Sequence, residues 1–554
     1  MVWVHLLGKF NLLWTADLDL VKYTARSIMK SINPFLLVLS IFAFMQTPLL
    51  GQANSDPLVY KVEGDSVTVV GCNKSVSGEV TIPETHMGKP VTAIGERAFI
   101  RCNALTGVVI PDSVITVGRG AFQQCAGLSD VTIGKRVTQM GGWVFSGSSS
   151  LTSVTIPDNV ISIGDYFFHR CTALERVVIG NGVTAIARST FGSCERLASV
   201  TIGTGVTEIR ESAFVFCKSL KSLTLPGNVT TIRNGAFASC ASLKKVILPE
   251  GVKTLGDQVF TSCRALEVVA LPDSLTTVGK SLFWGCSSLK QVTVGTGNPV
   301  FSSVDGALYE KGGKTLILIP AAKSGHFTVS TGVTTIAEST FTDCNKLTSV
   351  TIPEGVTEIP RNAFYRCIGL KKVTLPESLT TIGSYAFAYC SSLEMVHIPD
   401  NVTSVHTMAF YKCTGLKGIE VGKDNRNYSS EDGILFNKSR TEILKYPPTR
   451  EGEYTIPNSV TTVSKGAFRN CQGLTSVTLG NKVSLLGMFA FENCGKLASI
   501  MFEGIRPPEM PYDPEAFTGF QFSKVASNAK IYVKKEATGF KKQFSRLPVV
   551  IRDE

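Results

Sequence analysis

Cysteine thiols are the groups in this 554-residue chain that recur most regularly and could do chemistry. Fourteen of the fifteen cysteines are spaced by 23 residues or by a sum built on 23. They are Cys102, Cys125, Cys171, Cys194, Cys217, Cys240, Cys263, Cys286, Cys344, Cys367, Cys390, Cys413, Cys471 and Cys494. The sequence has no C-x-x-C pair, no H-E-x-x-H motif and no two histidines at i, i+4, which are the usual metal-ligand spacings. We therefore predict no metal site and no cofactor.

The redox state of this cysteine column has two interpretations. Stacked coils would bring neighbouring cysteines to ~4.8 Å, which is within the Cα separation that a disulfide permits. Complete pairing is impossible, however, because Ser148 occupies one place of the column and Cys72 lies outside the period. We therefore expect buried free thiols that act as small hydrophobic side chains. A redox ladder is the alternative, although no acidic-thiol signature favours it.

Other motifs that carry chemistry are absent from the sequence. There is no G-x-S-x-G motif for a nucleophilic serine, and GTGVTEIR and GTGNPV lack the third glycine and the helix of a phosphate-binding loop. The chain is mildly basic, with 55 Lys and Arg against 44 Asp and Glu. These charges are scattered and form none of the dense runs of a nucleic-acid arm. We predict that the protein is not an enzyme and does not bind nucleic acid.

Phenylalanine repeats more strictly than cysteine. A Phe stands three residues before all fifteen places of the column, and Phe145 is present even where Ser148 replaces the cysteine. The unit reads C-x-x-L-x-x-V-x-I-P-x-x-V-x-x-I-G-x-x-A-F-x-x-C, as in LTSVTIPDNVISIGDYFFHRC at 151–171. Its L-x-x-V-x-I segment alternates and is rich in β-branched residues, which predicts a short strand. The V-x-x-I segment predicts a second extended run.

A single coil of this kind cannot bury its own apolar face, but stacked coils can. Repetition at a fixed period is the sequence signature of a solenoid. We therefore predict a repeat solenoid of about 15 stacked 23-residue coils. The fold is expected to be mainly β, with A-F-x-x-C forming short helical turns or irregular corners that place Phe and Cys in the core.

The motif resembles the BspA-like, or Treponema-type, leucine-rich-repeat family. The segment LTSVTIPEGVTEIPRNAFYRC at 347–367 carries "IP" and "AFxxC", and other coils carry "IG". The resemblance covers about residues 60–554 and implies a leucine-rich-repeat horseshoe that adheres at a cell surface to host or neighbouring-cell proteins. The chain departs from the commoner leucine-rich pattern, because "IP" stands where an Asn or Cys usually follows the strand.

Two longer modules interrupt the 23-residue period, near 295–330 and 422–457. Their residues match at a constant offset of 127, as Asp305 and Asp432 illustrate. Each module reads strand, turn, strand, which predicts a hairpin that lengthens one coil. The period also breaks near both ends of the repeat region, where the open faces of the terminal coils need covers.

The N-terminal region carries a targeting signal. Lys30 provides a positive n-region, residues 35–44 an apolar h-region, and residues 51–53 a small-x-small cleavage site. This order predicts export with a cleaved signal peptide and no membrane span, and a retained N-terminal anchor is the alternative. The predicted segments are a non-translated or disordered extension at 1–28, the signal peptide at 29–53, an N-terminal cap at 54–90, the solenoid at 91–502 and a C-terminal cap at 503–554.

The outward strand positions carry the remaining functional information, because most of them are Ser or Thr and a few are not. An ice-binding threonine array is a remote alternative, since the interruptions are many and the solenoid is expected to curve. Apolar residues on a solvated strand mark an interface more often when they are contiguous. The preferred ligand-binding patch comprises Lys372, Met395, His397, Glu420 and Tyr428, and the second comprises Lys245, Ile247, Val268 and Ala270. The simpler interpretation is that Val and Ile merely suit strands.

Together these features predict an exported, adhesin-like binding protein, secreted or held at the cell surface. Its expected partners are extracellular or surface proteins, or glycans, which it recognises as a monomer through the solenoid surface. A structural or envelope-associated repeat protein without a specific ligand is the alternative function.

Overall fold

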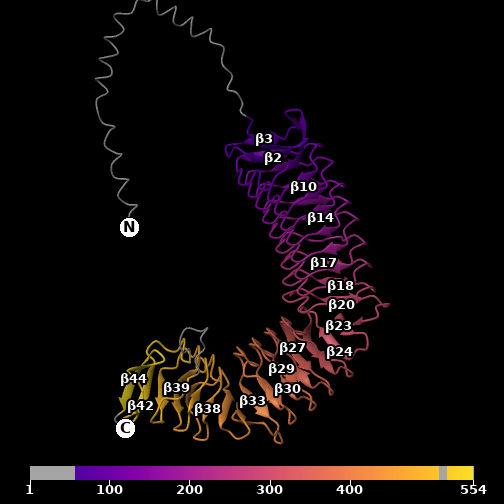
Figure 1. The fold of residues 1–554 in the computed structure, drawn as a ribbon. Helices are drawn as coiled ribbons and strands as arrows, with labels where there is room; N and C mark the ends of the chain where they lie inside the picture. Colours follow the sequence, from indigo (N-terminus) through magenta and orange to yellow (C-terminus); the bar gives the residue numbers. More distant parts are fainter. Residues whose placement is uncertain (1–55, 511–520, 553–554) are drawn as a thin grey trace, which may run out of the picture. The chain divides into compact units, whose positions relative to one another are not determined.

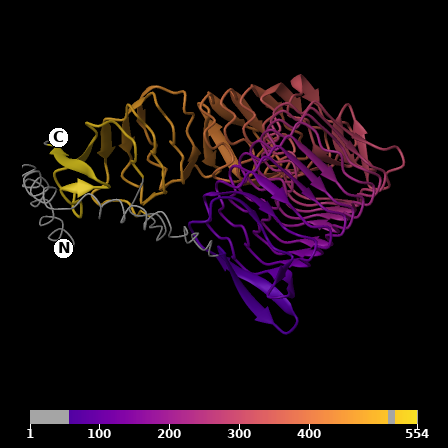
Figure 2. The ribbon, with the colours of Figure 1, turned by 90° about the horizontal axis from the view of Figure 1, so that it is seen from above.

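The computed structural model describes residues 56–510 and 521–552. Within the compact unit Leu58–Glu554, coil stacks on coil in chain order (Figure 1). The view from above shows the strands of successive coils side by side (Figure 2). The fold is a β-solenoid with 23-residue spacing, as the sequence predicts. The signal peptide predicted at 29–53 and the extension at 1–28 lie outside the described residues.

The L-x-x-V-x-I segments form the first-strand row. In β10 (Ser153–Ile156) Val154 and Ile156 are buried while the two residues between and before them are exposed. β10 pairs in parallel with β12 (Arg176–Ile179), so that Val154 lies opposite Val177, one repeat later. The other strands of this row are β3 (Gly78–Thr81), β6 (Leu105–Val109), β8 (Asp130–Thr132), β14 (Ser199–Ile202), β17 (Lys245–Ile247), β19 (Val268–Leu271), β21 (Gln291–Val294), β25 (Ser324–Thr328), β27 (Lys346–Thr351), β29 (Lys372–Thr374), β31 (Met395–Ile398), β33 (Gly418–Val421), β37 (Gly452–Thr455), β39 (Leu474–Leu479) and β41 (Ser499–Phe502).

The V-x-x-I segments form the second-strand row. Most of these strands have two residues, and the second one is apolar and buried, as Ile163 is in β11. Their parallel pairing again follows the repeat, with Ile163 opposite Met140. The row comprises β5 (Lys89–Ile94), β7 (Thr116–Val117), β9 (Gln139–Met140), β11 (Ser162–Ile163), β13 (Ala185–Ile186), β15 (Glu208–Ile209), β16 (Thr231–Ile232), β18 (Thr254–Leu255), β20 (Thr277–Val278), β26 (Thr335–Ile336), β28 (Glu358–Ile359), β30 (Thr381–Ile382), β32 (Ser404–Val405), β38 (Thr462–Val463) and β40 (Leu485–Leu486).

The Ala-Phe turns, which are the five residues before each cysteine, such as 362–366, form a third hydrogen-bonded row. The backbone N–H of Phe364 donates to the carbonyl of Ala386 in the next coil at 2.7 Å. Asn362 and Arg366 have φ angles of 57° and 61°, which a right-handed helix cannot contain. The expected short helical turns are therefore wrong, and no helix occurs in residues 56–510 or 521–552.

The Phe and Cys columns fill the core, as the sequence predicts. All fifteen column phenylalanines are buried, and the ring of Phe364 stacks on Phe341 at 4.5 Å and on Phe387 at 5.1 Å between centroids. The thiol of Cys367 donates to the carbonyl of Phe341, the column Phe of the preceding coil, at 2.9 Å. Ser148 makes the same bond, to the carbonyl of Phe122 at 3.3 Å. Serine is accepted in the column because its hydroxyl replaces the donor.

The two longer modules contain the predicted hairpins. β23 pairs antiparallel with β24 in the first module, and β35 with β36 in the second. Each module begins with one more antiparallel strand, β22 or β34, and its last strand joins the second-strand row through β26 or β38. The strands are β22 (Phe301–Val304), β23 (Ala307–Glu310), β24 (Thr315–Leu318), β34 (Tyr428–Glu431), β35 (Ile434–Asn437) and β36 (Glu442–Lys445).

Both ends of the solenoid carry additional strands. At the N-terminal end β1 and β2 form an antiparallel hairpin, and β2 pairs with β5. At the C-terminal end β42 continues the first-strand row beside β41, and β44 follows it. The strands are β1 (Leu58–Glu63), β2 (Ser66–Cys72), β4 (Thr85–His86), β42 (Lys530–Lys534), β43 (Gln543–Phe544) and β44 (Leu547–Arg552).

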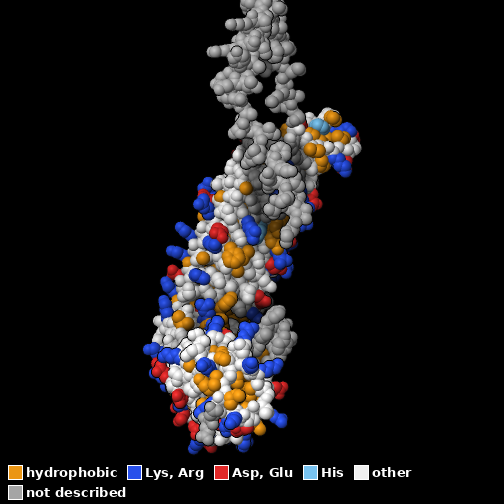
Figure 3. Space-filling model, turned by 90° about the vertical axis from the view of Figure 1, so that its left-hand side faces the viewer, with side chains coloured by type: hydrophobic (Ala, Val, Ile, Leu, Met, Phe, Trp, Pro, Cys, Tyr) orange, Lys and Arg blue, Asp and Glu red, His pale blue; other side chains and the backbone are white. Residues whose placement is uncertain are grey.

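The solenoid has about 19 turns, more than the 15 expected. The additional turns are those that begin with β21, β33, β41 and β42, which end without a column cysteine. In the described part of the chain no helix could span a membrane. Basic and acidic side chains are interspersed on the face shown in Figure 3.

Candidate functional site

The preferred patch from the sequence lies on three neighbouring strands of the first-strand row. Lys372 in β29 pairs with Met395 in β31, and His397 pairs with Glu420 in β33. Met395 is 39% exposed and its thioether covers Gly418, where an added Cβ would lie 3.2 Å from Sδ. His397 Nδ1 lies 4.0 Å from a carboxylate oxygen of Glu420. These four residues therefore share one solvent-facing surface.

Tyr428 does not join them on that surface. It begins β34, and its hydroxyl accepts a hydrogen bond from the backbone N–H of Val405 at 2.9 Å. Val405 belongs to β32 in the second-strand row. Burial raises the pKa of the Tyr428 phenol. The residue thus anchors the second module to a different face of the coil.

The second patch is also brought together. Lys245 and Ile247 of β17 pair with Val268 and Ala270 of β19. Ile247 is 57% exposed, whereas Val268 and Ala270 are partly buried. The patch is therefore a small apolar surface dominated by one isoleucine.

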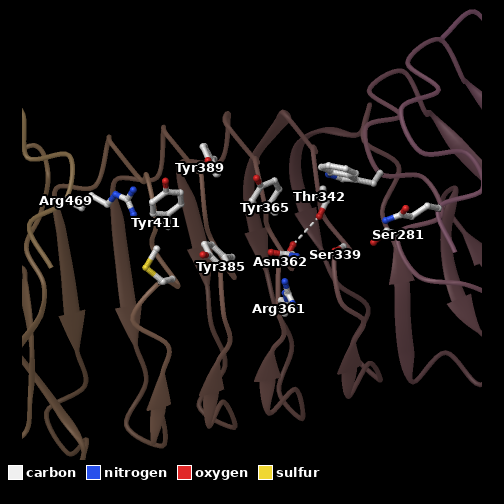
Figure 4. A pocket seen from close by; sticks show the side chains of 13 residues that line it. Ser281, Ser339, Thr342, Arg361, Asn362, Tyr365, Tyr385, Tyr389, Tyr411 and Arg469 are labelled. Carbon is white, nitrogen blue, oxygen red and sulfur yellow. Dashed lines mark hydrogen bonds between the residues drawn. The ribbon is translucent and has the colours of Figure 1, made fainter. Parts of the chain in front are cut away.

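A hollow that the strand-face pattern did not indicate lies on the Ala-Phe turns. This aromatic groove has a volume of about 550 Å³. Figure 4 shows Tyr365, then Tyr385 and Tyr389 from one turn, and then Tyr411 along the groove, with Arg361 beside Asn362 and Arg469 beyond Tyr411. The full lining comprises Gln258, Ser281, Trp284, Ser339, Thr342, Arg361, Asn362, Tyr365, Tyr385, Tyr389, Met408, Tyr411 and Arg469.

The tyrosine rings meet edge to face, which holds them apart and leaves ring surface along the groove. Tyr389 lies at the centre, with its ring centroid 5.3 Å from Tyr365 and 5.4 Å from Tyr411. Tyr385 contacts Tyr411 at 5.9 Å. Such pairs stabilise one another beyond the area that they bury, so the rings form a preorganised surface. Trp284 is 40% exposed at the other end of the lining.

Cations stack on part of this aromatic surface. The guanidinium of Arg469 lies 4.5 Å from the ring centroid of Tyr411 and is also paired with Glu492. Lys412 Nζ lies 5.0 Å from the ring centroid of Tyr389. Burial raises the pKa of Tyr365 and of Tyr411, and the neighbouring Tyr389 phenol adds to both shifts. The phenols therefore stay neutral at physiological pH and can donate hydrogen bonds.

The backbone beneath two of the tyrosines is strained. Tyr385 and Tyr389 have φ angles of 55° and 63°. A left-handed conformation costs an L-residue roughly 1–2 kcal/mol, and other coils place Gly there, for example Gly235 and Gly285. Among the described turns, only 385–389 has aromatic residues at both left-handed positions.

The sequence contained a signal for this groove. Tyr365 and Tyr411 directly follow the column Phe, as Trp284 does in an earlier coil, and Tyr389 directly precedes a column Cys. Aromatic residues thus gather in the two variable positions of F-x-x-C in coils close together along the chain. The repeat pattern assigns these positions only to a corner, whereas alternation in the strands indicates the strand faces.

Comparison with known families decides what this chain is. A model of the BspA type leucine rich repeat region (six copies) matches residues 92–221, 207–304, 322–438 and 451–538. The chain belongs to the BspA-type leucine-rich repeat family. The matched ranges include the coils that carry both strand-face patches and the aromatic groove. No curated protein sequence matches the chain.

Solved structures with the same kind of repeat resemble this BspA-type protein. A leucine-rich repeat protein from Bacteroides ovatus is 25% identical, with 82% of this chain and 99% of that chain covered and a TM-score of 0.50. A leucine rich cell surface protein from Faecalibacterium prausnitzii is 24% identical, covering 76% and 93%, with a TM-score of 0.41. The pneumococcal vaccine antigen PcpA is 19% identical, covering 90% and 98%, with a TM-score of 0.32.

Proposed function

We propose that this BspA-type repeat protein is exported and binds glycans at cell surfaces or in extracellular matrix, using the aromatic groove as its binding site. The export signal predicted at 29–53 supports the location. The solenoid supports a binding role, because stacked repeats present an extended surface. Catalysis is not part of the proposal, and in the described part of the chain no group of His, Cys, Asp or Glu could hold a metal ion.

The polarity of the groove favours a glycan over a protein as the ligand. Twelve of its thirteen lining side chains have a hydrogen-bonding group, and Met408 is the exception. An apolar side chain of a protein ligand would leave many of these groups desolvated without partners, which costs free energy. A glycan offers hydroxyl groups to the polar side chains and C–H faces to the aromatic rings. The combination of five aromatic and several polar neutral side chains therefore fits a sugar better than an apolar side chain of a protein ligand.

The row of turns also matches the form of a linear glycan. Successive coils are ~4.8 Å apart, a distance close to the length of one sugar unit in an extended oligosaccharide. Tyr365, Tyr389 and Tyr411 belong to three consecutive coils. A linear chain lying across the turns could therefore contact one aromatic residue per sugar. Arg361 adds a further donor near Asn362 (Figure 4).

The strand-face patch of Lys372, Met395, His397 and Glu420 is the competing surface for a protein ligand. Met and His are common at protein interfaces, and Met395 is exposed. Replacing Met395 by Ser and His397 by Thr would make this surface resemble its Ser- and Thr-rich neighbours. The strand-face patch can thus be tested by this double variant, and the aromatic groove by Trp284→Ala.

The proposal predicts that the chain binds a defined set of immobilised oligosaccharides, tested as a panel of neutral, sialylated and uronic-acid-containing glycans. It should also bind matrix glycoproteins, and enzymatic removal of their glycans should reduce binding at least about tenfold. Trp284→Ala should weaken binding to the oligosaccharides and to the glycoproteins, because it removes an exposed aromatic face of the groove. The Met395→Ser, His397→Thr variant is the matched control and should bind as the parent does.

Binding that persists after deglycosylation and is lost in the Met395→Ser, His397→Thr variant would contradict the proposal and assign a protein ligand to the strand face. Absence of binding to all glycans and all matrix proteins would favour a structural role without a specific ligand.

A further inference from the structure

Cys72 lies outside the 23-residue period, yet the structure places it against the first member of the cysteine column. It ends β2 in the N-terminal hairpin, whereas Cys102 closes the first coil. Their Sγ atoms are 2.7 Å apart, whereas the two sulfurs of a disulfide lie ~2.05 Å apart. Cys102 is fully buried and Cys72 is partly exposed. The two sulfurs therefore face each other across the junction of cap and coil.

Cys102 also differs from the rest of its column. Cys125 and Cys171 each donate to the carbonyl of the column Phe, or its equivalent, in the preceding coil, at 2.9 and 3.0 Å. Cys102 belongs to the first coil of the described chain, and residues 56–96 contain no earlier Ala-Phe turn to accept such a bond. Its thiol contacts Cys72 instead.

The surroundings of the pair favour a thiolate. Lys74 Nζ donates to the carbonyl of Ile100 at 2.6 Å and lies 4.0 Å from Cys102 Sγ. The hydrogen bond from Cys72, helped by the charge of Lys74 and opposed by burial, lowers the pKa of Cys102 to about 7, and the same hydrogen bond raises the pKa of Cys72. The thiolate of the pair is therefore at Cys102. By contrast, burial raises the pKa of Cys171 to about 12. Because the thiolate is the reactive form, oxidation should select the Cys72–Cys102 pair over the other cysteines.

We propose that Cys72 and Cys102 form a disulfide that ties the N-terminal hairpin to the first coil in the exported protein. The oxidant is a disulfide-bearing compound or enzyme of the oxidising compartment. The Cys102 thiolate takes the proton of Cys72, the accessible sulfur, as Cys72 attacks the oxidant's disulfide and forms a mixed disulfide. The thiolate released from the oxidant takes that proton from Cys102 and leaves as the first thiol. The Cys102 thiolate then attacks the Cys72 sulfur and releases the second thiol. The protein loses two hydrogen atoms in total, and the oxidant is reduced to two thiols.

This bond would secure the cover of an open solenoid end. β2 pairs with β5, and so extends the second-strand row beyond its first coil. Terminal elements are prone to local opening, and a covalent link between residues 30 positions apart restricts that opening. The inference does not depend on the proposed glycan binding, because the groove begins at Gln258 and lies outside this region.

The test is oxidation of the full chain with oxidised glutathione, followed by thiol titration in denaturant and peptide mapping without reduction. We expect thirteen free thiols, since two of the fifteen cysteines are consumed, and one cross-linked pair of peptides that contain Cys72 and Cys102. In Cys125→Ser, the control within the column, the same cross-link should form. In Cys72→Ser no intramolecular cross-link should form.

Hydrogen exchange provides a readout of the proposed role. Oxidation should slow the exchange of amides in β1 and β2 on the order of tenfold or more, and reduction should reverse the change. Fifteen free thiols after oxidation, or a cross-link from Cys102 to Cys125, would overturn the proposal. A confirmed cross-link without slower exchange in β1 and β2 would overturn its role in securing the hairpin.

Discussion

Replacing Phe364 by alanine should lower the free energy of unfolding of the coils around it by about 3–5 kcal/mol. The ring is fully buried and stacks between Phe341 and Phe387. Its removal deletes buried apolar surface and leaves a cavity that the two neighbouring coils, which are held by their own backbone bonds, cannot close. Denaturant unfolding monitored by circular dichroism measures the effect.

Cys367→Ser is the matched control for this prediction, because it changes the other column in the same coil. The serine hydroxyl can still donate to the Phe341 carbonyl, which the Cys367 thiol now reaches at 2.9 Å. The arrangement already exists at Ser148. The destabilisation should therefore be clearly smaller than that of Phe364→Ala. Equal losses of stability would mean that the Phe column does not dominate the packing.

Asn425→Ala should destabilise the second module by about 2–4 kcal/mol. The fully buried Asn425 side chain makes four hydrogen bonds to the backbone. Its amide donates to the carbonyls of Pro399 and Val402 at 2.8 and 3.1 Å, and its oxygen accepts from the N–H groups of Asn427 and Tyr428 at 2.9 and 2.8 Å. Removing it leaves the buried carbonyls of Pro399 and Val402 without these partners, and the two N–H groups lose theirs. Asn298 makes the equivalent bonds in the first module.

Hydrogen exchange and denaturant unfolding would locate and measure this loss. The expected pattern is faster exchange in β34 and β35, because Asn425 holds the start of that hairpin. Asn401→Ala serves as the control, since the exposed Asn401 amide donates to the carbonyl of Glu377 in the preceding coil at 2.8 Å. Equal losses of unfolding free energy in Asn425→Ala and Asn401→Ala would contradict the claim that the buried Asn425 amide stabilises the second module.

The repeat architecture could be predicted from the sequence because every apolar column recurs at one period. Phe364 and Val154 are buried where the pattern places them, and the strands pair in the register of the repeat. The hairpins of both modules could also be predicted, since their apolar alternation and the Asp305-Gly306 turn are local signals. These features follow from short-range chemistry that is repeated many times.

The Ala-Phe turns could not be predicted in the same way. Their left-handed φ angles occur at residues as different as Asn362, Arg366 and Tyr389, so the residue type does not predict the conformation. It is imposed by the backbone bonds between coils and by burial of the column Phe, which outweigh the local preference of the individual residue. The sequence therefore left two expectations open, short helical turns or irregular corners, and the chain makes strained corners.

The aromatic groove was missed for a related reason. Strand-face residues such as Met395 and His397 can be assigned to one surface by alternation alone, and the structure brings them together. The groove instead combines positions from turns whose shape was unknown. Likewise, the contact between Cys72 and Cys102 joins a cap to a coil, and a repeat pattern says nothing about residues outside the repeat.

The most direct test of the aromatic groove is calorimetric titration of the tightest glycan from the panel into a Tyr385→Gly, Tyr389→Gly variant. Glycine adopts the left-handed conformation without strain, so the gain in backbone energy offsets part of the lost ring contacts and the variant should remain folded. Phe216→Gly is the control, because Phe216 also has a left-handed φ of 60° and lies outside the groove.

The affinity for the glycan should fall at least about tenfold in the Tyr385→Gly, Tyr389→Gly variant. Phe216→Gly should bind as the parent does, and both variants should retain cooperative thermal unfolding. Unchanged affinity in a folded Tyr385→Gly, Tyr389→Gly variant would contradict the claim that the ligand lies in the groove.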